Sequence, residues 1–234
     1  MRVRRVSVYG AGVVGAVCLA GCVTPRTAAR LAVPANLGLA YFGTVGIHEG
    51  GHVLGAEAVG LAHGDVSNQT IRVDFLPVRD KEGQFHMGLT TVRHAGEWSD
   101  TDMTWFRIAG PATSFAAHIA CRELLKVGVG GAASPYLQPS LAWLSFGNQL
   151  SYYGHVVAGL ARIKSTDLGQ EDVWISVAFL VGGLSYDLFD LFSDPDPTGA
   201  LRFKVLIGEE FYSGSGSRLG IVSSPGFLGL HIAW

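Results

Sequence analysis

Apolar residues in this chain gather in long runs that are separated by shorter polar segments. The four longest runs cover residues 31–62, 105–127, 141–163 and 173–192. Each run is long enough for a helix of at least five turns. Residues 31–47 contain no charged side chain, and their number is close to the minimum for a membrane span. We therefore expect a bundle of about four apolar helices associated with a membrane, and the first run is either one long helix or two helices joined near Gly43.

Between the first two runs the pattern changes to the period of a β-strand. Residues 71–75 alternate between apolar and polar side chains, a charged turn follows at residues 79–83, and residues 85–92 return as a second strand. This arrangement is typical of a β-hairpin. The sequence thus predicts a mainly α-helical fold of the α+β class, with a hairpin at residues 70–93 inserted between helices.

The first 22 residues have the pattern of an export signal. Three arginines lie among the first five residues, and a short apolar segment follows at residues 6–18. Leu19-Ala20-Gly21-Cys22 then resembles the lipobox of bacterial lipoproteins, in which the cysteine is lipidated and becomes the first residue of the mature chain. We expect a signal peptide at residues 1–21, a lipid on Cys22 and a location in the inner or outer membrane of a bacterial cell envelope.

The rest of the chain divides into three parts. Residues 22–30 are a short polar tether, and residues 31–200 contain the apolar runs and the hairpin. Residues 201–234 alternate between apolar and polar side chains at residues 201–205 and contain further candidate strands near the end of the chain. We predict a helical domain followed by a small C-terminal β-ribbon.

The composition supports contact with a membrane. Hydrophobic residues make up 48% of the chain and charged residues only 15%, whereas soluble domains carry about 25% charged residues. The formal net charge of -2 gives no reason to expect a nucleic-acid partner. Membrane lipid is the expected partner of the apolar segments, and a lipid-tethered globular domain with the helices buried in its core is the alternative.

His48-Glu49-Gly50-Gly51-His52 is the segment with the clearest chemistry. Positions i and i+4 lie on one face of a helix, so His48 and His52 are placed to bind one zinc ion. Zinc lowers the pKa of a bound water towards neutrality, and Glu49 is placed to accept its proton and to pass it to a leaving amine. Three ionisable residues in an apolar helix are costly to bury without a functional role.

This H-E-x-G-H pattern on a hydrophobic helix resembles the site-2 protease family of membrane zinc metallopeptidases. That family has β-structure after the motif helix, which the predicted hairpin matches, and a G-P-x-x-N element that opens a later helix. Gly110-Pro111-Ala112-Thr113-Ser114 matches this element except that Ser114 replaces the asparagine. The resemblance implies Zn²⁺ as the cofactor and an aspartate as the third ligand, in an L-D-G pattern that is missing from this chain.

Two aspartates are candidates for that third ligand. Asp172 is the first choice, because it lies just before an apolar run, as the resemblance requires. Its alternative role is that of an acidic residue at a helix start. Asp187 is the second choice, because it interrupts an apolar helix, although it also fits an emerging helix end.

Several other polar residues lie in the apolar runs. His118 and His155 are expected to be core residues rather than ligands. Asn148, Tyr152 and Tyr153 have groups that can stabilise a developing oxyanion, and packing is their alternative role.

These observations predict a zinc metalloendopeptidase that cleaves a protein or peptide substrate in or near a membrane, by a zinc-bound water activated by Glu49. The alternative is a non-catalytic lipid-anchored protein whose H-E-x-x-H segment is structural or vestigial.

Overall fold

The computed structural model describes residues 25–64, 69–79, 83, 85–93, 97–129, 134–164, 166–194, 200–211, 219–224 and 227–232. The predicted signal peptide and Cys22 lie outside these residues, so the lipid anchor stays a prediction.

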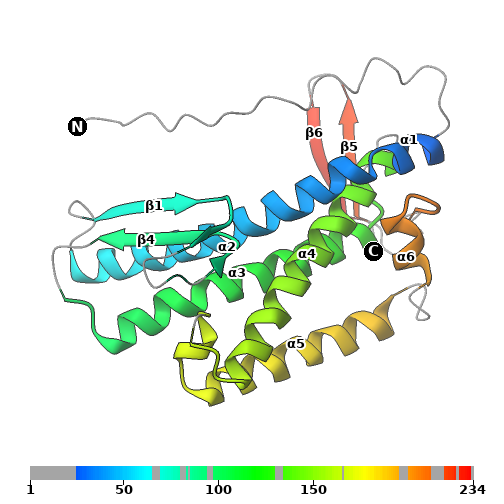
Figure 1. The fold of residues 1–234 in the computed structure, drawn as a ribbon. Helices are drawn as coiled ribbons and strands as arrows, with labels where there is room; N and C mark the ends of the chain where they lie inside the picture. Colours follow the sequence, from blue (N-terminus) through cyan, green and yellow to red (C-terminus); the bar gives the residue numbers. More distant parts are fainter. Residues whose placement is uncertain are drawn as a thin grey trace.

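The fold is mainly α-helical, with small antiparallel sheets, as the sequence predicts. The helices are α1 (Pro25–Leu31), α2 (Val33–His63), α3 (Asp100–Lys126), α4 (Ser134–Leu160), the short 3-10 helix η4 (Leu168–Gln170), α5 (Val173–Ser193) and α6 (Ala200–Leu206). Helices α2, α3 and α4 pack against one another, and α5 packs against α4 (Figure 1). The predicted bundle of about four long helices is confirmed.

The predicted hairpin forms beside α2 (Figure 1). Its strands β1 (Thr70–Asp74) and β4 (Leu89–Arg93) pair antiparallel. Between them, β2 (Val78–Arg79) pairs with β3 (Phe85–His86). The C-terminal ribbon consists of β5 (Leu219–Ser224) and β6 (Phe227–Ile232), which also pair antiparallel.

Two parts of the chain differ from the prediction. Helix α1 forms within the segment that was predicted to be a tether, and α6 forms where residues 201–205 were predicted to be a strand. The reason for the second error is visible in the packing. Leu201 and Val205 are four residues apart, a spacing that puts them on one face of either a strand or a helix, and both contribute to a cluster around Leu125 of α3.

Helix α2 is continuous through Gly43, which settles the choice between one helix and two. A Cβ at Gly43 would lie 2.6 Å from the Leu144 side chain, so this glycine allows α4 to approach closely and does not break the helix. The helix ends at Gly64, whose φ of 69° is left-handed and favours glycine. One rigid helix therefore carries the whole H-E-G-G-H segment.

Helix α3 packs closely against that segment. A Cβ at Gly51 would lie 2.5 Å from the Ala109 carbonyl oxygen, and a Cβ at Gly55 would lie 2.9 Å from the Ala109 Cβ. Small residues at this i, i+4 spacing let two helix backbones approach each other. The contact brings Gly110 next to the motif histidines.

The Gly-Pro element does not open a helix, and this expectation was wrong. Helix α3 begins at Asp100, after a capping box in which the Ser99 side chain accepts a hydrogen bond from the Asp102 backbone N–H. Pro111 therefore lies inside the helix, where it cannot donate the usual backbone hydrogen bond.

A buried ionic network joins the far ends of α3, α5 and α6. The Arg122 guanidinium contacts the Asp190 carboxylate at 3.1 Å and the Asp194 carboxylate at 2.6 Å. Arg202 and Lys126 also contact Asp190, at 2.9 and 2.7 Å. The side chains of Arg122, Asp190 and Asp194 are almost completely buried, so each charge depends on its partners.

Helix α5 presents a different surface on its outer side. Among the described residues, it is the one helix that is both long and apolar enough to cross a membrane. Its large exposed apolar side chains are Trp174, Val181, Leu184, Leu188, Phe189 and Phe192.

Candidate metal centre

His48 and His52 lie one turn apart on α2, and both are buried. Their Nε2 atoms are 3.2 Å apart. The Nδ1 of His52 donates to the Phe106 carbonyl oxygen at 2.8 Å, and the Nδ1 of His48 lies 3.3 Å from the Ser114 hydroxyl. Partners at Nδ1 orient each ring and leave Nε2 as the metal-binding nitrogen. Ser114, which replaces the asparagine of the family pattern, therefore positions a histidine.

Asp167 supplies the carboxylate that faces this pair. It lies in the loop between α4 and α5, directly before η4. Its Oδ2 is 3.1 Å from His48 Nε2 and 3.3 Å from His52 Nε2. Ligand atoms about 2.0–2.1 Å from a tetrahedral zinc lie about 3.3–3.4 Å from one another. The three atoms therefore have the spacing of one face of a zinc tetrahedron.

The loop that carries Asp167 is anchored to α3 by Glu171. The buried Glu171 carboxylate accepts hydrogen bonds from Thr104 Oγ1 at 2.6 Å and from Arg107 Nη1 at 2.8 Å. These contacts fix the loop four residues after Asp167, so the carboxylate is placed before any metal binds.

The two aspartates proposed from the sequence lie elsewhere. Asp172 is the N-cap of α5, where its exposed side chain accepts a hydrogen bond from the Trp174 backbone N–H at 2.9 Å. Asp187 accepts hydrogen bonds from Gln149 and Tyr153 and lies 3.5 Å from His118 Nε2. Neither contacts the motif histidines, and the carboxylate that lies beside them is that of Asp167.

The sequence at Asp167 contains a pattern from which this residue could have been predicted as a ligand candidate. Asp167-Leu168-Gly169 contains the three residue types of the L-D-G pattern in another order. The residues stand in a different order here, and the strong helix-start signal at Asp172 favoured a ligand five residues further along the chain.

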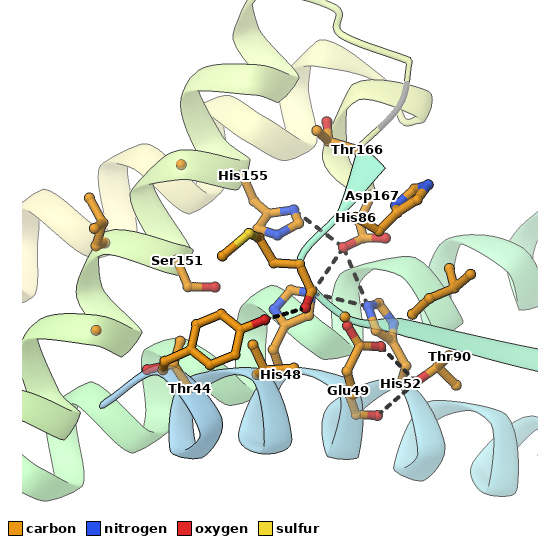
Figure 2. Close-up of a pocket in the computed structure, with 18 of the residues that line it drawn as sticks. Thr44, His48, Glu49, His52, His86, Thr90, Ser151, His155, Thr166 and Asp167 are labelled. Carbon is orange, nitrogen blue, oxygen red and sulfur yellow. Dashed lines mark hydrogen bonds and ion pairs between the residues drawn. The ribbon is translucent and has the colours of Figure 1, made fainter. Parts of the chain in front are cut away.

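Glu49 points into the same cavity and is oriented by the hairpin (Figure 2). Its Oε2 accepts a hydrogen bond of 2.7 Å from Thr90 Oγ1 on β4. A Cβ at Gly88 would lie 2.8 Å from Glu49 Oε1, so the hairpin packs directly on the carboxylate. The inserted β-structure thus positions the proposed base.

Gly110 forms the wall of the metal centre on the α3 side. A Cβ at this position would lie 2.4 Å from His52 Nε2 and 2.8 Å from His48 Nε2. Glycine at 110 therefore lets the backbone of α3 pack directly against the two imidazole rings. The donor types and their spacing fit a zinc ion held by His48, His52 and Asp167.

The charges around Asp167 keep its carboxyl group ionised, which is the form that binds a metal ion. Burial raises its pKa, but the adjacent His52, His48 and His155 outweigh burial and hold the pKa well below the usual range. Burial lowers the pKa of His52, while Asp167 and the Phe106 carbonyl raise it, and the net shift is upward. In the metal-free protein, a proton on His52 therefore competes with a metal ion.

His155 on α4 also reaches the centre, although the sequence predicted a core role. Its Nδ1 lies 3.2 Å from Asp167 Oδ2, and its ring stacks on that of His48 with 4.5 Å between centroids. No pattern in the sequence separates it from His118, which contacts Ser145 and Asp187 away from the centre.

The proposed oxyanion donors have structural partners instead. Asn148 donates to the Leu144 carbonyl, Tyr152 donates to the Phe179 carbonyl, and Tyr153 donates to Asp187. None of the three lines the cavity that holds the metal centre.

That cavity has a volume of about 720 Å³, which is the size of a typical ligand site. One part is lined by apolar and aromatic side chains of α2 and α4, namely Leu37, Tyr41, Trp143, Phe146 and Leu150. The part beside Asp167 is polar and includes Arg107, Thr166 and Gln170. The metal centre lies where these two linings meet.

Comparisons of the chain with protein-family models, curated proteins and solved structures found no match. The function is therefore inferred from the geometry of the centre.

Proposed function

We propose that the protein is a zinc-dependent peptidase that hydrolyses peptide bonds in or near a membrane. The observation that carries this proposal is the arrangement of His48, His52 and Asp167 at zinc-ligand spacing, with Glu49 in the same cavity. Two histidines and a carboxylate leave a coordination position for water, which is the pattern of catalytic rather than structural zinc.

In this proposal, each side chain has a defined task. Zinc supplies Lewis acidity, which polarises a carbonyl and makes a water acidic near neutral pH. Glu49 accepts the proton from the attacking water and donates it to the amide nitrogen as the C–N bond breaks. Thr90 holds the Glu49 carboxylate in position through its 2.7 Å hydrogen bond.

The lining of the cavity supports, as the substrate, a peptide that has an apolar part and a more polar part. An apolar segment fits the part lined by α2 and α4, and a more polar segment fits the part beside Arg107 and Gln170. The exposed apolar face of α5 supports membrane contact, to which the predicted lipid on Cys22 would add.

The test uses the purified full chain in detergent, loaded with zinc, and a set of quenched fluorescent peptides with apolar and polar halves. Glu49→Gln should keep its zinc and lose activity by about 10²–10⁴-fold, because the proton carrier is removed. Glu57→Gln is the matched control, since Glu57 is exposed two turns later on the same helix.

Three results would overturn the proposal. A wild-type chain that binds no zinc would exclude the zinc peptidase. A wild-type chain that binds zinc but cleaves no peptide or membrane protein would instead favour a non-catalytic lipoprotein with a structural site. Peptidase activity that survives Glu49→Gln would show that Glu49 is not the base.

A further inference from the structure

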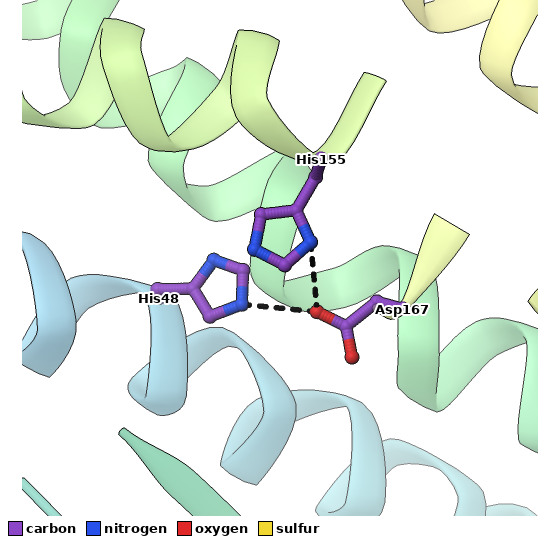
Figure 3. Close-up of side chains that lie close together, drawn as sticks. All are labelled: His48, His155 and Asp167. Atoms are coloured by element: carbon purple, nitrogen blue, oxygen red, sulfur yellow. Dashed lines mark hydrogen bonds and ion pairs between the residues drawn. The ribbon is translucent and has the colours of Figure 1, made fainter. Parts of the chain in front are cut away.

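Three histidine nitrogens converge on one carboxylate oxygen in the metal centre. Asp167 Oδ2 lies 3.1 Å from His48 Nε2, 3.3 Å from His52 Nε2 and 3.2 Å from His155 Nδ1. Figure 3 shows contacts from the His48 and His155 rings to the same carboxylate oxygen of Asp167. The three nitrogens come from two helices that are far apart in the chain.

The surroundings of His155 are those of a ligand rather than of a core histidine. Within the described part of the chain, its buried Nδ1 has no hydrogen-bond partner and makes the ion-pair contact with Asp167. The ligand atoms of His48, His155 and Asp167 all lie within 4.8 Å of one another. A nitrogen placed in this way needs either a proton shared with Asp167 or a metal ion.

Holding Asp167 in place does not require His155. The loop is already fixed by the Glu171 carboxylate, which receives hydrogen bonds from Thr104 and Arg107. The Thr166 hydroxyl also donates to the Ile163 carbonyl at 2.8 Å, next to Asp167. The position of His155 Nδ1, 3.2 Å from the Asp167 carboxylate oxygen, is therefore better explained by metal binding.

We propose that His155 is a fourth protein ligand of the metal, through Nδ1, in addition to His48, His52 and Asp167. This inference rests on the proposed function, because it assumes a metal bound by those three residues. A fourth protein ligand would complete the tetrahedron of the resting metal, so the catalytic water would enter when the zinc expands to five ligands, as it does in the transition state of some catalytic sites. A set of three histidines and one aspartate would also bind the metal more tightly than the three-ligand set that the sequence predicted.

The test compares two substitutions of His155 that differ in one property. His155→Ala removes both the ligand and any hydrogen bond to Asp167. His155→Asn places an amide N–H near the position of Nδ1, so it keeps a hydrogen-bond donor for Asp167 but is a poor zinc ligand. His118→Ala is the matched control, because His118 is a buried histidine of the same bundle outside the metal cavity.

Zinc affinity is measured by competition with a chelator. The visible absorption spectrum of the cobalt(II)-loaded full chain is measured as well, because this spectrum depends on the number and type of metal ligands. Both His155 variants should bind zinc more than about 100-fold more weakly, above the range of about 10–100-fold that losing a hydrogen-bond partner of a ligand usually costs, and both should shift the cobalt spectrum. His118→Ala should change neither. Thermal unfolding of the metal-free variants shows whether each one folds.

The result that would overturn the proposal is a His155→Asn variant with the affinity and cobalt spectrum of the wild type, since His155 would then only hold Asp167. A wild-type chain that binds neither zinc nor cobalt would instead overturn the proposed function itself. The two failures are thus distinguishable.

Discussion

Replacing Gly110 with alanine perturbs the metal centre without removing any ligand. The new Cβ would lie 2.4 Å from His52 Nε2, whereas ordinary contacts of a Cβ begin near 3.4 Å. His52 would therefore have to retreat by about 1 Å, while zinc sites tolerate deviations of only about 0.2 Å in ligand distance. The substitution should weaken zinc binding while leaving every donor atom in the chain.

The size of the effect follows from the cost of overpacking. Small-to-large substitutions in a packed interior cost about 1–3 kcal/mol, which corresponds to about 5–150-fold in affinity. The assay is calorimetric zinc titration of the full chain in detergent. Thermal unfolding of the metal-free protein, measured in parallel, separates a blocked site from a misfolded one.

Gly50→Ala is the matched control, because Gly50 belongs to the H-E-G-G-H segment and a Cβ there has no heavy atom within 4 Å. Alanine should stabilise α2 by up to about 1 kcal/mol and leave zinc binding unchanged. A Gly110→Ala variant that binds zinc within about twofold of the wild type would show that zinc binding does not depend on the present positions of the two histidine nitrogens, which would contradict the ligand geometry.

Three further predictions test the surroundings of the centre. Thr90→Val should lower kcat about tenfold without loss of zinc, because Glu49 loses its orienting hydrogen bond. Thr91→Val is the control, because Thr91 is exposed. An unchanged kcat in Thr90→Val would contradict this role of Thr90. Zinc affinity should fall as the pH drops through the raised pKa of His52, because protons then compete with the metal for this ring. Titrations between about pH 5.5 and about pH 8 that show constant affinity would contradict this. Arg122→Ala should destabilise the metal-free chain by about 1.5–3 kcal/mol in thermal unfolding, because charged hydrogen bonds to Asp190 and Asp194 are lost while Lys126 and Arg202 still contact these carboxylates, and a loss below about 1 kcal/mol would refute it.

The sequence was sufficient for the parts of the protein that local patterns determine. The apolar runs became α2 to α5, and the alternation near Ile71 became one strand of a hairpin. His48 and His52 could be paired from the sequence alone, because one helix turn brings positions i and i+4 together. Glu49 followed from the same local spacing.

The remaining members of the centre depend on how distant segments pack. Asp167 lies 3.1 Å from His48 in space but 119 residues away in the chain. Asp172 has the stronger local signal, because an acidic residue directly before an apolar run favours a helix start, and it does cap α5. His155 lies in an apolar run, and its distinction from His118 arises from the side of the bundle that each one faces. Gly110 is a wall of the centre only because Gly51 lets α3 approach α2.

The place of Asp167 before α5 also bears on where a substrate meets the metal. Asp167 precedes Val173, the first residue of α5, by six residues. The 21 residues of α5 extend for about 31 Å at about 1.5 Å per residue, which matches a hydrocarbon core of about 30 Å. A membrane crossed by α5 would therefore have one surface near Val173, and the metal centre would lie close to that surface rather than at the middle of the bilayer. We expect the cleaved bond to lie near the membrane surface, with the apolar part of the substrate extending along α2 and α4 towards the bilayer.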